Sequence, residues 1–172
     1  GMALTIFRLA TLYGEGDPGN VGRLIRAVDS GRFLWVGDGS NRKSLLYKDD
    51  AARAVMSVIE RPMQGVNTYN VSAPPCTMRE IVNNIEEALG KRVLPLRMPV
   101  SLALLLSWFF SKIPHARLQG LHQIIKKWLS EDVYNTQLFQ ETFGFHTKTS
   151  LQDGLKREVE WYRQNLSHNQ AR

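Results

Sequence analysis

Hydrophobic residues recur with two different periods along this chain, and each period predicts one type of element. Short apolar runs rich in β-branched and aromatic residues predict strands, whereas apolar residues three or four positions apart predict helices. The expected strands are Leu4–Tyr13, Phe33–Val36, Leu45–Tyr47 and Asn67–Val71. The expected helices cover residues 21–30, 51–60, 78–89, 118–128, 136–143 and 151–162. Helices interspersed with a few short strands predict a helix-rich α/β fold.

Residues that begin and end helices support these boundaries. Side-chain oxygens that accept helix N–H groups are expected at the N-caps Asn20, Asp50, Thr77 and Ser150. Glu80 stands three residues after Thr77, which is the spacing of a capping box. Gly31 and Gly90 follow the first and third helices, where glycine commonly ends a helix.

The most apolar window is Met98–Ser111, bounded by Arg97 and Lys112. It is shorter than the roughly 20 residues that a membrane-spanning helix needs. A helix that is apolar nearly all round is usually buried by protein, so we expect a core helix or a protein interface. The alternative is a helix lying in a membrane interface, with Trp108 and Lys112 at the level of the headgroups.

The amino-acid composition indicates the class of protein, and the net charge indicates the kind of partner. The chain has 172 residues, 43% of them hydrophobic, and a net charge of +6, which predict one soluble globular domain with an anionic partner. We expect this domain at 3–166, a cloning remnant at 1–2 and a disordered tail at 167–172. The single cysteine, Cys76, rules out an internal disulfide and favours a cytoplasmic setting.

The segment Gly14–Gly19 spells G-x-G-x-x-G between a strand and a helix, as in dinucleotide-binding loops. Asp17 would place a carboxylate against a pyrophosphate, and Pro18 removes an amide from the loop. We therefore expect a polar turn here, with a small dinucleotide-binding protein as an alternative. The N-terminal strand precedes any element that could cover it, so we also expect this chain to be a fragment of a larger sheet protein.

A Gly-Asp-Gly turn at Gly37–Gly39 precedes two adjacent cations, Arg42 and Lys43. Folding does not require two cations beside a strand, whereas a phosphate ligand would use both. Asn20, the Phe33–Val36 strand and these cations are expected to converge as an amide, flat apolar walls and phosphate contacts. The alternatives are a solvated turn for the cations and a core position for the aromatic residues.

No group of residues predicts covalent or acid–base catalysis. The four histidines lack metal-ligand spacing, and Cys76 lacks the signature of a nucleophile. We expect no catalytic residue and no metal site in this chain.

The order of these features resembles the carboxy-terminal half of the NAD-dependent epimerase/dehydratase family. This family of extended short-chain dehydrogenases includes UDP-glucose and UDP-N-acetylglucosamine 4-epimerases. The resemblance covers almost the whole chain and rests on an ordered set: Arg8, Leu12-Tyr13-Gly14-x-Gly16-Asp17, Asn20, Gly31, Val36-Gly37-Asp38-Gly39, Tyr47-x-x-Asp50-x-Ala52, Thr68-Tyr69-Asn70-Val71, Ile81, Phe143-Gly144-Phe145, Ser150-Leu151-x-x-Gly154-Leu155 and Trp161-Tyr162.

The resemblance implies a helix-rich substrate-binding lobe, the C-terminal half of an extended Rossmann-type enzyme without its N-terminal dinucleotide-binding half. NAD(P) would be bound mainly by that other half, either in the same protein or in a partner chain, and a UDP-sugar by this one. The family's Tyr-x-x-x-Lys pair does not occur in these 172 residues, so the isolated chain is expected to be catalytically silent. No nucleic acid is expected as a partner, and an oligomer is compatible with the pattern.

By the same resemblance, Leu9, Ala10 and Leu12 would lie near the nicotinamide. Substrate contacts would come from Thr11, Asn20, Val21, Phe33, Leu34, Trp35, Val36, and either Arg42 or Lys43. The family's second phosphate-binding arginine, in an Arg-x-Gly-Asp context, is missing after Gly90. A non-enzymatic module that docks on a membrane or partner through residues 98–111 is the alternative function.

Overall fold

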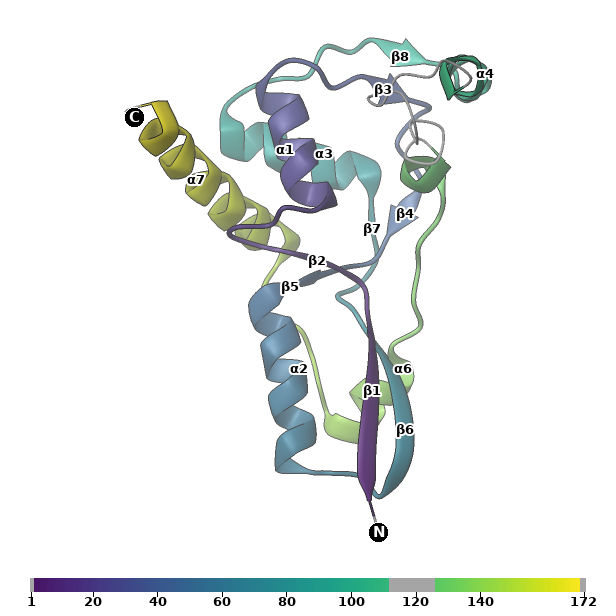
Figure 1. Cartoon of the computed structure of the whole chain (residues 1–172), viewed down its shortest axis with the longest axis vertical. Helices are drawn as coiled ribbons and strands as arrows, with labels where there is room; N and C mark the ends of the chain where they lie inside the picture. Colours follow the sequence, from purple (N-terminus) through teal and green to yellow (C-terminus); the bar gives the residue numbers. More distant parts are fainter. Residues whose placement is uncertain (1, 112–125, 171–172) are drawn as a thin grey trace.

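The computed structural model describes residues 2–111 and 126–170. It has a helix-rich α/β fold with short strands (Figure 1). The strands are β1 (Ala3–Leu9), β2 (Thr11–Tyr13), β3 (Trp35–Val36), β4 (Arg42–Lys43), β5 (Leu45–Tyr47), β6 (Gly65–Val71), β7 (Cys76–Thr77) and β8 (Arg97–Met98). The helices are α1 (Asn20–Asp29), α2 (Lys48–Glu60), α3 (Met78–Leu89), α4 (Val100–Ser111), α6 (Gln137–Phe143) and α7 (Leu151–Gln170).

Within the described residues the strands form four pairs. β1–β6, β2–β5 and β3–β8 are parallel, and β4–β7 is antiparallel. The longest pair runs in register from Ala3 beside Gly65 to Leu9 beside Val71. Figure 1 shows β2 and β5 crossing between a lower part, with β1, β6, α2 and α6, and an upper part, with α1, α3 and α7.

Each part has its own hydrophobic core. In the lower core, aromatic rings from α6 and its flanks pack against β6, and Phe139 lies within 5.5 Å of Tyr69 between ring centroids. In the upper core, one apolar face from each of α1, α3 and α7 meets the others, as the helical spacing of their apolar residues dictates. The buried residues of these three faces are Val21, Leu24, Ile25, Val28, Met78, Ile81, Val82, Ile85, Leu89, Leu155 and Val159.

Two of the predicted helix starts are confirmed. The Thr77 hydroxyl accepts the Glu80 N–H at 3.1 Å, and the Glu80 carboxylate accepts the Thr77 N–H, forming the capping box. The Ser150 hydroxyl accepts the Asp153 N–H at 3.0 Å. Gly90 ends α3 in the left-handed conformation, with φ of 61°.

The other two predicted caps are wrong. Asn20 is the first residue of α1 rather than its cap, and the carboxylate of Asp17 instead accepts the Gly19 and Gly22 N–H groups at 2.7 and 3.1 Å. Asp50 lies inside the first turn of α2 and is 1% exposed. Its carboxylate accepts the Lys148 and Thr149 N–H groups at 2.9 and 3.1 Å, so its role is to fix a distant loop.

Several boundaries also differ from the prediction. Only Trp35–Val36 of the expected strand at residues 33–36 pairs with another strand. α7 continues to Gln170, into the stretch for which disorder was expected. Of the helix predicted at residues 118–128, residues 126–128 are helical and the rest lies outside the described residues.

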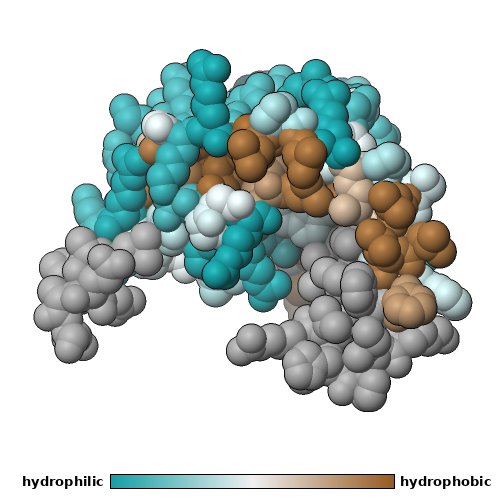
Figure 2. All heavy atoms as spheres, turned by 90° about the horizontal axis from the view of Figure 1, so that it is seen from above, coloured by the Kyte–Doolittle hydropathy of each residue, from teal (hydrophilic) through white to brown (hydrophobic). Residues whose placement is uncertain are grey.

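α4 forms at the expected place but is not a core helix. Ala103 is 2% exposed, whereas Leu105, Trp108 and Phe109 are 61%, 52% and 62% exposed. Figure 2 views this end of the molecule from above and shows brown apolar residues on its surface. Of the two expected roles, burial in the core of this chain is therefore wrong, and burial at a protein interface stays a prediction. None of the helices in the described ranges combines the length and apolarity needed to cross a membrane.

A close approach between α7 and β2 yields a stability prediction. A Cβ atom added at Gly154 would lie 2.5 Å from the Tyr13 hydroxyl oxygen and 2.9 Å from the nearest atom of its ring. We expect Gly154→Ala to lower the free energy of unfolding by about 1–3 kcal/mol through overpacking, despite the higher helix propensity of alanine. Urea denaturation measures this change.

Lys156→Ala, at an exposed position of the same helix, is the matched control, and we expect it to change stability by less than about 0.5 kcal/mol. A Gly154→Ala variant as stable as the unmodified protein would contradict the close packing of α7 on Tyr13.

Candidate functional site

Two adjoining cavities lie where α1, β3, the start of α3 and residues 127–132 meet. The larger has a volume of about 410 Å³, within the range of small-ligand sites, and the smaller about 50 Å³. Four residues line both cavities: Asn20, Leu24, Met78 and Trp128. The larger cavity can hold a small organic ligand, and the smaller has room for little more than water.

Apolar and aromatic side chains wall the larger cavity. The rings of Phe33 and Trp35 meet edge to face, 5.1 Å apart between centroids. Gly39 brings the backbone against Trp35, because a Cβ there would lie 2.7 Å from the ring and its φ of +73° suits glycine. The Gly-Asp-Gly turn therefore makes room for one wall of the cavity.

The charged groups that line this cavity are cationic. Arg23 from α1 and Arg32 from the segment before β3 both line it, and both are exposed. No carboxylate is among the described residues that line it. Two guanidinium groups beside aromatic walls favour a ligand with a flat apolar part and a negatively charged part.

Asn20 supplies the amide that the sequence predicted. It lines both cavities, and its side chain makes no hydrogen bond with another described residue. An amide can donate and accept hydrogen bonds, so it can bind either a phosphate oxygen or the edge of a base.

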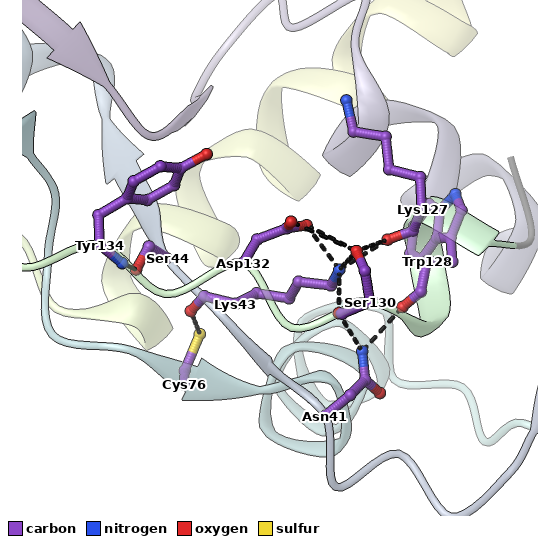
Figure 3. A network of polar contacts seen from close by, with 9 residues as sticks. All are labelled: Asn41, Lys43, Ser44, Cys76, Lys127, Trp128, Ser130, Asp132 and Tyr134. Carbon is purple, nitrogen blue, oxygen red and sulfur yellow. Dashed lines mark hydrogen bonds and ion pairs between the residues drawn. The ribbon is translucent and has the colours of Figure 1, made fainter. Parts of the chain in front are cut away.

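Lys43 and Asp132 line the smaller cavity and belong to the network of hydrogen bonds shown in Figure 3. The ammonium of Lys43 donates to the carbonyl oxygens of Lys127 and Ser130, each at 2.7 Å, and to the Asp132 carboxylate at 2.8 Å. Asn41 donates from its amide to the Trp128 carbonyl oxygen at 2.8 Å. These contacts connect β4 to a segment that follows it by more than 80 residues.

The structure brings together most of the residues predicted to bind substrate. Thr11, Asn20, Val21 and Lys43 line the smaller cavity. Asn20, Phe33, Leu34, Trp35 and Val36 line the larger one. Arg42 lines neither of these two cavities and is exposed on β4. Of the two cations singled out in the sequence, Lys43 is thus already bonded and Arg42 lies outside the site.

The residues expected near a nicotinamide divide into two kinds. Leu9 and Leu12 are 37% and 43% exposed, whereas Ala10 is 5% exposed in the lower core. The Ala10 N–H donates to the Val71 carbonyl oxygen at 3.0 Å. Leu9 and Leu12 therefore present apolar surface, and Ala10 contributes to the fold.

The Gly14–Gly19 loop does not form a phosphate cradle. The amides at the start of α1 already bind an anion, the carboxylate of Asp17. A Cβ at Gly22 would lie 2.3 Å from the Asp17 carbonyl oxygen, so the loop also packs closely on the helix. A pyrophosphate at this position would have to displace Asp17.

Sequence reasoning missed Arg23, Arg32 and Trp128 as lining residues. Arg23 is an exposed residue of α1, and nothing in the local sequence pattern connects it to β3. Trp128 comes from a distant segment, so hydrophobic periodicity could not place it beside α1 and α3. The described residues contain no cluster of three or more His, Cys, Asp or Glu side chains that could hold a metal ion.

Two further titratable groups, one partly buried and one buried, have raised pKa values. Burial, with a contribution from Glu80, raises the pKa of the Cys76 thiol to about 11, so the thiol is protonated and unreactive at neutral pH. Glu158 on α7 is 2% exposed, and neither of its carboxylate oxygens accepts a hydrogen bond in the described structure.

Burial raises the pKa of Glu158 to about 8, with smaller contributions from Asp17 and Glu15. The Gly14 N–H and the Arg26 guanidinium act in the opposite direction without forming a hydrogen bond to either oxygen. Glu158 is therefore neutral in the folded protein at pH 7 and ionised in the unfolded chain.

This difference predicts a pH-dependent stability. Between the unfolded pKa of 4.5 and the folded pKa of about 8, unfolding releases the Glu158 proton, so stability should fall as pH rises through this window. In Glu158→Gln this contribution is absent. We expect the variant to be more stable than the unmodified protein at pH 8 by about 1–3 kcal/mol relative to their difference at pH 4.5.

Urea denaturation at several pH values measures the effect. Glu160→Gln, at an exposed position of the same helix, is the control and should leave the pH profile unchanged. Identical pH profiles for Glu158→Gln and the unmodified protein would show that Glu158 is not buried in its neutral form.

Comparison with known protein families gives one match. The model of the NAD dependent epimerase/dehydratase family matches residues 1–72. Among curated relatives, the chain is 27% identical over 163 residues to N-acetyl-α-D-glucosaminyl-diphospho-ditrans,octacis-undecaprenol 4-epimerase of Escherichia coli O157:H7, covering 92% of this chain and 49% of the relative. The chain spans about half the length of the curated relatives it matches.

Solved structures confirm the fold. UDP-glucose 4-epimerase of Thermotoga maritima, determined with UDP-glucose, superposes with a TM-score of 0.67 at 22% identity, over 96% of this chain and 47% of that one. MoeE5 in complex with UDP-glucuronic acid and NAD gives a TM-score of 0.66 at 23% identity, over 95% of this chain and 48% of that one. The α/β fold of this chain is thus that of about half of these proteins.

Proposed function

We propose that this chain is the nucleotide-sugar-binding part of an NAD-dependent epimerase/dehydratase. The observation that carries the proposal is the cavity of about 410 Å³ with aromatic walls, two arginines and no carboxylate among its described lining residues. A UDP-sugar has a flat base for such walls and a diphosphate for such cations. The family match over residues 1–72 and the similarity to UDP-sugar epimerases support the same assignment.

In this proposal the base lies among Phe33, Trp35 and Trp128, where the cavity is most aromatic. The diphosphate lies toward Arg23 and Arg32, which replace Arg42 and Lys43 as the expected phosphate contacts. Asn20 and Val21 lie between the two parts, because Asn20 lines both cavities and Val21 is its neighbour on α1. Thr11 lies on the side of the smaller cavity, toward the sugar.

The reacting cofactor belongs to another part of the complete enzyme. We propose that an N-terminal Rossmann half, in the same protein or in a partner chain, binds NAD(P) and contacts the apolar surface of β1, β2 and β6. The exposed apolar residues of these strands are Leu4, Ile6, Leu9, Leu12 and Val66. When bound there, NAD(P) would supply hydride transfer at the sugar, with Leu9 and Leu12 of this chain beside the nicotinamide.

Two consequences follow for the chain by itself. It binds nucleotide sugar without turning it over, since the Tyr-x-x-x-Lys pair expected of the family is absent from these residues. It works in the cytoplasm, where nucleotide sugars and a reduced Cys76 coexist. Turnover of a UDP-sugar by the isolated chain, assayed with and without a fused Rossmann half, would contradict the first statement.

Binding can be measured directly by titrating the chain with UDP and following heat by calorimetry. We expect Arg23→Gln and Arg32→Gln each to weaken UDP binding by about tenfold, because each removes a charge-assisted hydrogen bond to phosphate. Arg42→Gln is the matched control and should leave UDP affinity unchanged, since Arg42 lies outside both cavities.

Equal UDP affinities for the unmodified protein and the three arginine variants would contradict the assignment of Arg23 and Arg32 as phosphate contacts. Binding of NAD in preference to UDP would favour the small dinucleotide-binding protein instead. Co-sedimentation with liposomes, without any UDP binding, would favour the membrane-docking module.

A further inference from the structure

The segment from Lys127 to Tyr134, here called the strap, is bonded to β4 and to Asn41 (Figure 3). Its residue Trp128 lines the larger cavity. We propose that Lys43 is a positioning residue that holds the strap, and through it Trp128, and that it does not contact the phosphate of the ligand. This inference rests on the proposed function, because the wall that Trp128 forms is the one assigned to the base.

The hydrogen bonds of Lys43 leave no donor for a ligand. A lysine ammonium has three N–H donors. Three acceptors of the strap lie within 2.8 Å of this nitrogen: the carbonyl oxygens of Lys127 and Ser130 and the carboxylate of Asp132. The side chain of Lys43 is also only 11% exposed. A phosphate could reach the ammonium only by displacing one of these acceptors.

The charge at this position is also compensated. Asp132 forms an ion pair with Lys43 and itself lines the smaller cavity. An anion entering that cavity would meet a carboxylate beside the ammonium, so its attraction to Lys43 would be offset by repulsion from Asp132. Removing Asp132 from its buried partner would be unfavourable as well.

Other contacts connect the strap to the same stretch of backbone. The Ser44 N–H donates to the Asp132 carbonyl oxygen at 2.7 Å, and the Asp132 N–H donates to the Arg42 carbonyl oxygen at 3.0 Å. The Tyr134 N–H donates to the Ser44 hydroxyl at 3.2 Å. The later part of the strap therefore pairs with β4 through an isolated bridge at Asp132. Lys43 and Asn41 hold its earlier part, residues 127–130, through their side chains.

Trp128 connects this anchor to the site. Its carbonyl oxygen accepts the Asn41 amide, and its side chain lines both cavities beside Leu24 and Met78. Lys43 bonds to the residues on either side of it, Lys127 and Ser130. Loss of these bonds would displace Trp128 from the cavity wall. It would therefore weaken the binding of charged and uncharged ligands alike.

Uridine and UDP separate positioning from phosphate binding, since they share the base and differ in the diphosphate. In Lys43→Met, which keeps the length of the side chain and removes its donors, we expect both affinities to fall by the same factor, about three- to tenfold. If Lys43 instead contacted the phosphate, Lys43→Met would lower the affinity for UDP and leave the affinity for uridine unchanged. That result would overturn the proposal. Arg42→Gln, one residue away and exposed, is the control and should change neither affinity.

The variant Asp132→Asn should change UDP affinity in opposite directions for the two possible roles of Lys43, positioning the strap or contacting phosphate. It weakens the anchor but leaves the ammonium of Lys43 charged and less compensated. Positioning predicts weaker binding of both uridine and UDP, whereas phosphate binding predicts unchanged or tighter UDP binding. The second result would also overturn the proposal.

Hydrogen–deuterium exchange tests the anchor without any ligand. In Lys43→Met and Asp132→Asn we expect faster exchange, by about tenfold or more, at the amides of Ser44, Asp132 and Tyr134, with unchanged protection in β6. Unchanged exchange at these three amides would overturn the proposal even if UDP binding failed altogether. Failure of the unmodified protein to bind either uridine or UDP would overturn the proposed function while leaving the exchange result to decide the role of Lys43.

Discussion

The parallel pairing of β2 with β5 is the constraint on which both cores depend. Thr11, Leu12 and Tyr13 lie beside Leu45, Leu46 and Tyr47 in register. Because side chains alternate across a strand, β5 sends Leu45 and Tyr47 into the upper core and Leu46 into the lower one. A shift of this pair by one residue would exchange these side chains between the cores and expose the helices packed on each.

Buried polar groups are distributed unevenly around this pair, and the difference separates structural from ligand-facing positions. Asp50 and Lys43 are both buried and fully bonded, each to a segment more than 80 residues away. Asn20 and the two arginines line the larger cavity, and their side chains form no hydrogen bond with another described residue. Glu158 is the exception, a buried carboxylate that the fold accommodates by keeping it protonated.

Local rules predicted the local features well. The Thr77–Glu80 capping box and the Gly90 helix end depend only on neighbours within a few residues, so sequence alone could place them. Asp50 follows the same local pattern as an N-cap, but its carboxylate binds Lys148 and Thr149, and no rule of spacing contains that contact. The exposure of α4 could not be predicted from its sequence either, because an apolar composition does not specify a covering surface.

The candidate site shows the same division. Asn20 and Phe33–Val36 were found because an amide and a hydrophobic strand are local signals, and the structure places them on one cavity. Arg42 and Lys43 stand out because they are neighbours in sequence, whereas Arg23 and Arg32 become neighbours of the larger cavity only through the fold of the helix and loop between them. Which side chains from distant segments meet at one cavity depends on the tertiary structure, so local sequence patterns do not specify it.

The environment of Cys76 has a practical consequence for spectroscopy. Its thiol is partly buried, hydrogen-bonds weakly to the Lys43 carbonyl oxygen, and stays protonated at neutral pH. Because it is the only cysteine, a maleimide dye would react preferentially with a thiol introduced at an exposed position such as Glu131. Motion of the strap then becomes measurable by fluorescence in a protein that retains its native cysteine.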